Sequence, residues 1–132
     1  MKRYILGIII TGAVIISGAF ALPRTVDNPV IEKAVVQFTE PVKLQSVILK
    51  GDYLFIHDEE KMAKGEPCSY VYTYEAGKQE KLVASFHCIP MKREPVDHFT
   101  VIVSFTSAGS PLPELLEYRF AGSAEGHKVP AS

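Results

Sequence analysis

The stretch CSYVYTYEAGKQEKLVASFHC, residues 68–88, decides the fold class. Its two ends are rich in aromatic and β-branched residues, whereas its middle is charged and contains a glycine, a pattern typical of a β-hairpin. We expect the turn at 75–81, centred on Lys78, between strands at 70–74 and 82–89. The stretch therefore predicts a pair of antiparallel strands.

Both cysteines of the chain lie at the open end of this hairpin. Symmetric pairing about Lys78 places Cys68 directly opposite Cys88, and paired residues have Cα atoms about 4.5–5.5 Å apart, within disulfide range. Two cysteines in an exported domain most often form a bridge, and a closed loop of about twenty residues adds about 3 kcal/mol of stability. We predict a Cys68–Cys88 disulfide, with two free thiols as an alternative.

Three tyrosines alternate along the first strand of the hairpin and therefore share one face. These are Tyr70, Tyr72 and Tyr74. In the symmetric register the residues opposite them are all apolar: Leu82, Ala84 and Phe86. This pairing predicts that the tyrosine face packs on the core. The alternative is an exposed aromatic row that contacts a sugar or a protein.

The rest of the chain continues the pattern of short strands separated by proline, glycine and charged residues. We expect turns at Pro41 and 50–52, and a short helix at 58–64 that Asp58 caps and Gly65 ends. The sequence predicts an all-β fold, either an antiparallel β-sandwich or a small open barrel of about seven strands. The expected strands are 34–39, 42–49, 53–57, 70–74, 82–89, 99–106 and 115–120.

The run FTEPV at 38–42, followed by 47–53 with Gly51 and by Phe55, resembles a known pattern. It is similar to the first hairpin of a loose group of small exported bacterial β-domain proteins. The similarity continues through 66–68, 70–72 and 85–88, and so covers roughly residues 35–90. The resemblance implies an exported all-β domain and carries over no functional residue.

The N-terminus has the three parts of a secretory signal peptide. Lys2 and Arg3 precede an uncharged apolar run, and Ala19-Phe20-Ala21 supplies small residues at the cleavage positions. We predict export to the periplasm or the medium; a retained membrane anchor is the alternative, because the apolar run approaches the length of a span. The expected organisation is a signal peptide at 1–21, an irregular lead-in at 22–33, one β domain at 34–121 and a flexible tail at 122–132.

Composition excludes several function classes. The 132 residues carry a formal net charge of −1 without a basic cluster, so a nucleic-acid partner is not expected. The chain has no glycine-rich phosphate loop, HExxH pair or nucleophile elbow. A hydrolase triad of Ser85, His87 and Asp58 is disfavoured, since Ser85 and His87 are neighbours on one strand. We therefore predict a non-enzymatic protein that uses no cofactor.

A metal site is the other role that the cysteines could have. The candidate ligands are spread over the chain: His57, His87, His98, Cys68 and Cys88, with Met62 or Met91 as thioethers for copper. Against such a site, His87 and Cys88 are adjacent in a strand and point to opposite faces. His98 and His127 fall in a predicted loop and tail, where histidines are usually structural or exposed. The sequence therefore predicts no metal-binding residue.

Small size, β architecture and export together predict a binding or interaction module of the cell envelope or the medium. Its partner would be a protein, a glycan or an envelope component. The alternative is a carrier of a small ligand or a metal ion, built on a β-barrel.

Overall fold

The computed structural model describes residues 30–105 and 112–131. In this part of the chain the regular structure is mostly strand, and the strands form one sheet. They are β1 (Ile31–Leu44), β2 (Val47–Asp58), β3 (Ser69–Glu75), β4 (Lys78–Phe86), β5 (Ile89–Lys92), β6 (Thr100–Ser104), β7 (Glu114–Arg119) and β8 (Glu125–Lys128). The short helix α2 (Glu59–Ala63) follows β2.

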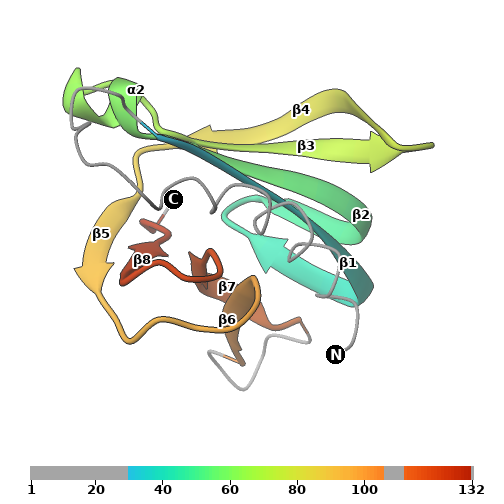
Figure 1. The fold of residues 1–132 in the computed structure, drawn as a ribbon. Coiled ribbons are helices and arrows are strands. Elements are labelled where there is room, and N and C mark those ends of the chain that lie inside the picture. Colours follow the sequence, from blue (N-terminus) through green and yellow to red (C-terminus); the bar gives the residue numbers. More distant parts are fainter. Residues whose placement is uncertain (1–29, 106–111, 132) are drawn as a thin grey trace.

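The sheet is curled into a half-barrel. Its strand order is β4-β3-β2-β1-β7-β8-β5, and β6 pairs with β7 outside this path. Strands β1 to β4 form one long curved layer, and β5 to β8 gather beneath its concave side (Figure 1). The pairings are antiparallel, apart from a parallel bridge between β1 and β7 at Lys43 and Glu114. The prediction of a mostly antiparallel, all-β fold is therefore confirmed.

Strands β1 and β2 continue through the two positions at which the sequence predicts turns. The register between them shifts between Phe38 and Val42, so that Pro41 lies where the ladder is interrupted and its missing N–H removes no regular hydrogen bond. Gly51, with φ of 105°, lies within β2 near this irregularity. The two strands instead turn at Gln45, whose φ is 55°. The predicted breaks at Pro41 and Gly51 were therefore wrong, because a bulge and not a turn accommodates both residues.

The β3–β4 hairpin exists as predicted, but its register is different. The turn consists of two residues, Ala76 and Gly77, both with positive φ, and Glu75 pairs with Lys78. Val71 is consequently fully buried, whereas Tyr70, Tyr72 and Tyr74 are only partly buried on the opposite face. The prediction that the tyrosines face the core was wrong, since the shorter turn gives them other partners across the hairpin.

Helix α2 begins as predicted at Asp58, whose carboxylate accepts hydrogen bonds from the backbone N–H groups of Glu60 (3.0 Å) and Lys61 (3.2 Å). These bonds satisfy donors that the first helical turn leaves without partners. The helix lies at one end of the curved layer, whereas the β3–β4 turn lies at the other end (Figure 1).

The C-terminal segment is part of the sheet. β8 lies within the predicted flexible tail at 122–132 and pairs with both β5 and β7, so the tail prediction was wrong for Glu125 to Lys128. The predicted signal peptide at 1–21 lies outside the described residues, as does the lead-in up to residue 29, whereas the prediction of an irregular lead-in was wrong for residues 31–33, which belong to β1. Among the residues that are described, no helix is both long and apolar enough to cross a membrane.

Aromatic side chains fill the space inside the curl. The ring of Tyr118 on β7 lies edge-on to Phe55 on β2, with centroids 5.4 Å apart, and edge-on to Phe120 at 5.7 Å. Phe99 contacts the same rings, and all four residues are almost completely buried. This cluster holds β7 against the concave side of β2. It also contacts the buried His127, which belongs to a group of polar side chains at the α2 end of the core.

Candidate metal centre

Three buried side chains from distant parts of the sequence meet inside the half-barrel. His57 is near the end of β2, His127 is in β8, and Cys88 lies between β4 and β5. Their exposed fractions are 1%, 0% and 7%. One possible ligand atom from each of the three lies within 4.8 Å of the other two. A thiol and two imidazoles are ligand types that zinc and copper prefer.

The strand pattern explains why these residues point inward. Tyr53, Phe55 and His57 alternate along β2 and are all buried, so His57 continues the inner face of that strand. His127 is paired with Tyr118 of β7, and its ring centroid lies 5.0 Å from that of Tyr118. The curl of the sheet thus brings β8 across the core to β2, although these strands are not neighbours in the sheet.

The distances within the group are close to those of a coordination shell. Cys88 Sγ lies 3.5 Å from His127 Nδ1, and the centroids of the two imidazole rings are 4.0 Å apart with the planes inclined by 31°. Ligand atoms around a tetrahedral zinc ion lie about 3.3–3.8 Å apart, given bonds of about 2.0–2.3 Å. Small side-chain adjustments are therefore sufficient for the three residues to share an ion.

Three of the four imidazole nitrogens are buried without a hydrogen-bond partner among the described residues. They are Nδ1 and Nε2 of His57 and Nε2 of His127. Buried polar atoms are nearly always hydrogen-bonded, because an unpaired one costs about 1–3 kcal/mol. A bound cation would satisfy these nitrogens. Their lack of hydrogen-bond partners distinguishes the two histidines from core histidines whose ring nitrogens are hydrogen-bonded.

Glu32 lies beside both imidazoles. Its Oε1 atom is 3.9 Å from His57 Nδ1 and 4.0 Å from His127 Nε2, too far for direct hydrogen bonds. Each ring therefore has one nitrogen near a carboxylate, and His127 has its other nitrogen near Cys88. Metal-binding histidines usually place a carboxylate in this outer position, where it fixes the orientation of the ring.

Burial controls the protonation of the group. It lowers the pKa of His127 to about 3, with the neighbouring His57 adding to the effect. Burial also lowers the pKa of His57, although Glu59 and Asp58 oppose this. Both imidazoles are consequently neutral near pH 7, which is the form that binds metal ions.

The acidic members of the group have raised pKa values. Burial and, to a smaller extent, the hydrogen bond with Cys68 together raise the pKa of Cys88 to about 12. The metal-free thiol is therefore protonated, and an ion that binds it must displace the proton. Burial, together with the charges of Glu59 and Glu125, raises the pKa of Glu32 to about 7.

The two cysteines lie together, as the hairpin predicts. Their sulfur atoms are 3.2 Å apart and both residues are buried free thiols, so they are in contact but not at the bond length of a disulfide, about 2.05 Å. The backbone N–H of Cys88 also points to Cys68 Sγ at 3.4 Å. The predicted proximity is confirmed, and the predicted covalent bond is not present in this state.

The other candidate ligands are not part of this group. His87 is exposed, in agreement with its predicted position on the face opposite to Cys88, and His98 is exposed as well. Met62 and Met91 are partly buried. Of the imagined triad, Ser85 and His87 are both exposed, and Asp58 caps α2. Sequence reasoning missed His127, because residues 121–128 are mostly small or polar and lack the β-branched and aromatic residues that predict a strand.

Two further contacts hold the surroundings of the group in place. Ser69 and Tyr118 form a buried side-chain hydrogen bond that joins β3 to β7. Glu117, also nearly buried, accepts from Arg93 Nε and from Arg119 Nε, each at 2.9 Å. This ion network is next to β8, because Arg119 pairs with Gly126. Both contacts fix β7, against which His127 packs.

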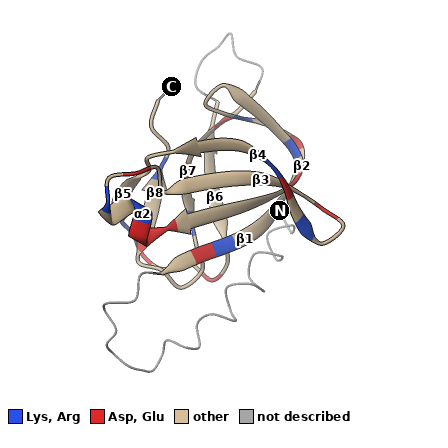
Figure 2. Ribbon diagram, turned by 90° about the horizontal axis from the view of Figure 1, so that it is seen from above, with Lys and Arg blue, Asp and Glu red and all other residues tan. Residues whose placement is uncertain are grey.

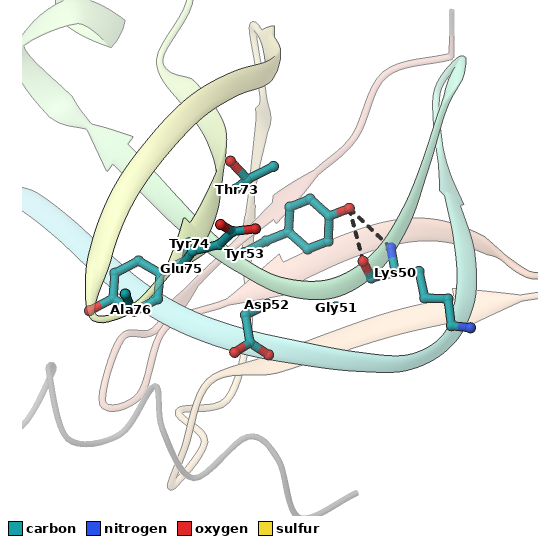
Figure 3. A pocket seen from close by; sticks show the side chains of 8 residues that line it. All are labelled: Lys50, Gly51, Asp52, Tyr53, Thr73, Tyr74, Glu75 and Ala76. Atoms are coloured by element: carbon teal, nitrogen blue, oxygen red, sulfur yellow. Dashed lines mark hydrogen bonds between the residues drawn. The ribbon is translucent and has the colours of Figure 1, made fainter.

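A separate hollow of about 410 Å³ lies at the other end of the sheet. It is lined by Lys50–Tyr53 and Thr73–Ala76 and is open to solvent (Figure 3). The Tyr53 hydroxyl donates to the Lys50 carbonyl oxygen at 3.2 Å and accepts from the Lys50 N–H at 3.1 Å. The Tyr53 hydroxyl is thus used within β2, and the hollow has no buried histidine or cysteine comparable to those of the first site.

Besides Glu32, further acidic side chains lie at the end of the sheet that carries α2. Asp58, Glu59 and Glu60 surround the start of this helix, and Figure 2 shows the negative charge of α2 beside the sheet. This arrangement favours a cation at the nearby histidines. No family model, curated protein or solved structure matches the chain.

Proposed function

We propose that the protein is a non-enzymatic carrier that binds one transition-metal ion through His57, Cys88 and His127. The observation that carries this proposal is the meeting of three nearly inaccessible metal-binding side chains, of which both histidines have buried nitrogens without partners. The nitrogens not directed at Glu32, Nε2 of His57 and Nδ1 of His127, are the expected ligands.

The ligand types restrict the ion. A thiolate with two neutral imidazoles suits zinc or copper, whereas calcium and magnesium require shells of oxygen ligands. Displacement of the Cys88 proton makes binding dependent on pH. The burial of all three ligands supports retention or transport of an ion rather than its presentation to a substrate.

The test measures metal binding by the full chain, purified under reducing conditions and stripped with a chelator. We expect one Zn²⁺ per chain by elemental analysis, and Co²⁺ should produce thiolate-to-metal charge-transfer bands. Cys88→Ser and His127→Gln should each weaken Zn²⁺ binding by about 100-fold or more, beyond the loss typical of an outer-sphere partner. Circular dichroism establishes that each variant is folded.

His87→Gln is the matched control, since His87 adjoins Cys88 in sequence but is exposed. It should bind Zn²⁺ as the unsubstituted chain does. Equal binding by folded Cys88→Ser and His127→Gln variants, or absence of Zn²⁺ binding by the reduced chain, contradicts the proposal.

A second candidate function is contact with a glycan through the outer face of the sheet. Tyr70 and Tyr72 are partly exposed there and border a hollow of about 280 Å³ with Ile56 and Lys33. Aromatic rings beside polar groups stack on sugar rings. Chemical-shift changes confined to this face on titration with oligosaccharides, and lost in Tyr72→Ala, would support this function; unchanged spectra would exclude it for the sugars used.

We further propose that the chain is exported and that the mature protein begins at Leu22. The charged start, apolar run and Ala19-Phe20-Ala21 site support this proposal. Mass spectrometry of the protein recovered from its native cells should give a chain starting at Leu22. Recovery of the chain with its N-terminal segment intact in the membrane fraction would instead support an anchor.

A further inference from the structure

We propose that Cys68 is a redox partner of the metal site: a reversible Cys68–Cys88 disulfide competes with the ion for Cys88, so that only the dithiol form binds metal. This inference rests on the proposed function and concerns the regulation of the same site. Its basis is that the sulfur atom of Cys88 lies close to two possible partners, the sulfur of Cys68 and a ring nitrogen of His127. Cys88 Sγ lies 3.2 Å from Cys68 Sγ and 3.5 Å from His127 Nδ1.

Cys68 is positioned as a partner for Cys88 rather than as a fourth ligand. The group whose ligand atoms all lie within 4.8 Å of one another includes Cys88 but not Cys68. Two thiolates on one tetrahedral zinc ion are about 3.7 Å apart, given Zn–S bonds of about 2.3 Å. The observed separation of 3.2 Å is shorter than this and indicates direct contact between the two sulfurs.

The two states exclude each other chemically. A metal ligand must be a thiolate, whereas a disulfide sulfur carries no negative charge and binds zinc poorly. Formation of the bond also shortens the separation of the two sulfurs from 3.2 Å by about 1 Å, so Cys88 Sγ is held by Cys68 in place of an ion. Conversely, a thiolate bound to an ion is no longer available to attack a disulfide.

The bridge forms by exchange with an external disulfide. The thiolate of one cysteine attacks a sulfur of that disulfide, releases one thiol and leaves a mixed disulfide; the second cysteine then displaces the other thiol. Two protein thiols are oxidised and one external disulfide is reduced to two thiols, which take up the two protons. Reduction by excess small thiol reverses both steps.

The position of the cysteines in the fold determines when this exchange is easy. Both flank the β3–β4 hairpin, whereas the proposed metal ligands include His127 of β8. Both cysteines are buried once β5 to β8 have packed beneath the sheet. Exchange is therefore easiest before the half-barrel closes, and metal binding requires that it has closed.

The experiment compares two preparations of the full chain, refolded either with glutathione disulfide or with excess reductant, and then treated with a chelator. Mass spectrometry should find the oxidised preparation 2 Da lighter, as expected for loss of two hydrogens. The reduced preparation should bind one Zn²⁺, and the oxidised one should bind at least about 100-fold more weakly. Reduction should restore binding, and Zn²⁺ added to the reduced chain should protect the Cys88 thiol from alkylation.

Two cysteine variants separate the roles. Cys68→Ser should bind Zn²⁺ nearly as tightly as the reduced chain after either refolding, with mass spectrometry used to confirm that Cys88 carries no glutathione. Cys88→Ser should bind weakly after both. Serine retains the size of cysteine, so the two variants differ mainly in which sulfur is lost.

Three outcomes overturn the inference. The oxidised chain binds Zn²⁺ as tightly as the reduced chain, or no intramolecular bridge forms on refolding, or Cys68→Ser loses binding as Cys88→Ser does, which makes Cys68 a ligand. In the first and third outcomes the reduced chain still binds zinc, so the proposed metal-binding function survives. Failure of both the reduced chain and Cys68→Ser to bind Zn²⁺ contradicts the function itself.

Discussion

At the scale of the residue, the buried imidazoles couple folding to pH. In the unfolded chain a histidine has a pKa of about 6.5, whereas the pKa of folded His127 is about 3. As pH falls from about 6.5 to about 3, protons bind the unfolded chain preferentially, so the contribution of His127 to stability is lost. His57, whose pKa is also lowered by burial, acts in the same direction.

Glu32 opposes this dependence. Its pKa is raised to about 7 in the fold, so its contribution to stability is present at low pH and is lost as pH rises from about 4.5 to about 7. We therefore predict that, as the pH rises from 5 to 7, the free energy of unfolding of Glu32→Gln increases more than that of the unsubstituted chain. Urea unfolding at several pH values measures this difference. The exposed Glu40 of the same strand provides the control, since Glu40→Gln should leave the pH dependence unchanged.

The residue before His127 is constrained by packing. A Cβ atom at Gly126 would overlap Glu117 Oε2 and would approach Arg93 Cγ to 2.9 Å. Glu117 cannot easily move, because Arg93 and Arg119 both hold its carboxylate. We predict that Gly126→Ala lowers the free energy of unfolding by about 1–3 kcal/mol, the usual cost of overpacking.

Urea unfolding measures this loss, and a double-mutant cycle identifies its cause. In a Glu117→Ala background the overlap with Glu117 is absent and Arg93 loses the carboxylate that holds it, so Gly126→Ala should cost much less. An equal cost in both backgrounds would show that contact with Glu117 is not responsible.

Among the elements of the fold, the β3–β4 turn has a sequence that is not optimal for its backbone conformation. Both turn residues have positive φ, 53° at Ala76 and 78° at Gly77, as a type I′ turn requires. Alanine is strained at such a φ, whereas asparagine tolerates it. We predict that Ala76→Asn raises stability by about 0.5–1 kcal/mol, measured by thermal or urea unfolding. Lys78→Asn, just outside the turn, should not stabilise the protein.

The same turn shows what the sequence could and could not predict. Alternation and turn composition identified the hairpin and brought Cys68 and Cys88 together. The register was not predictable, because a two-residue turn with later bulges satisfies the pattern as well as the symmetric turn does. Pro41 and Gly51 were mistaken for turns for a similar reason, since bulges and turns favour the same residues. The proposed metal centre depends on the curl of the sheet, which brings His127 next to His57; these residues are far apart in the sequence, and no local pattern predicts their contact.

Across the molecule, a metal ion would connect two strands of the sheet, β2 and β8, that are not hydrogen-bonded to each other. Strands β2 and β8 are separated in the sheet by β1 and β7, and β1 meets β7 at a single parallel bridge. An ion held by His57, Cys88 and His127 would connect them directly across the concave side. Such a connection stabilises the folded state through mass action, by about 2.7 kcal/mol when free Zn²⁺ is 100-fold above Kd.

We therefore predict that Zn²⁺ raises the thermal unfolding midpoint of the reduced chain and slows hydrogen exchange unevenly. The amides of β8 should gain the most protection, because this short strand near the C-terminus depends most on the new connection. The amides of β6, which pairs with β7 outside the main path, should change little. His127→Gln should abolish both effects, whereas His87→Gln should preserve them. Uniform protection across the sheet, without preference for β8, would indicate general stabilisation rather than an ion held between β2 and β8.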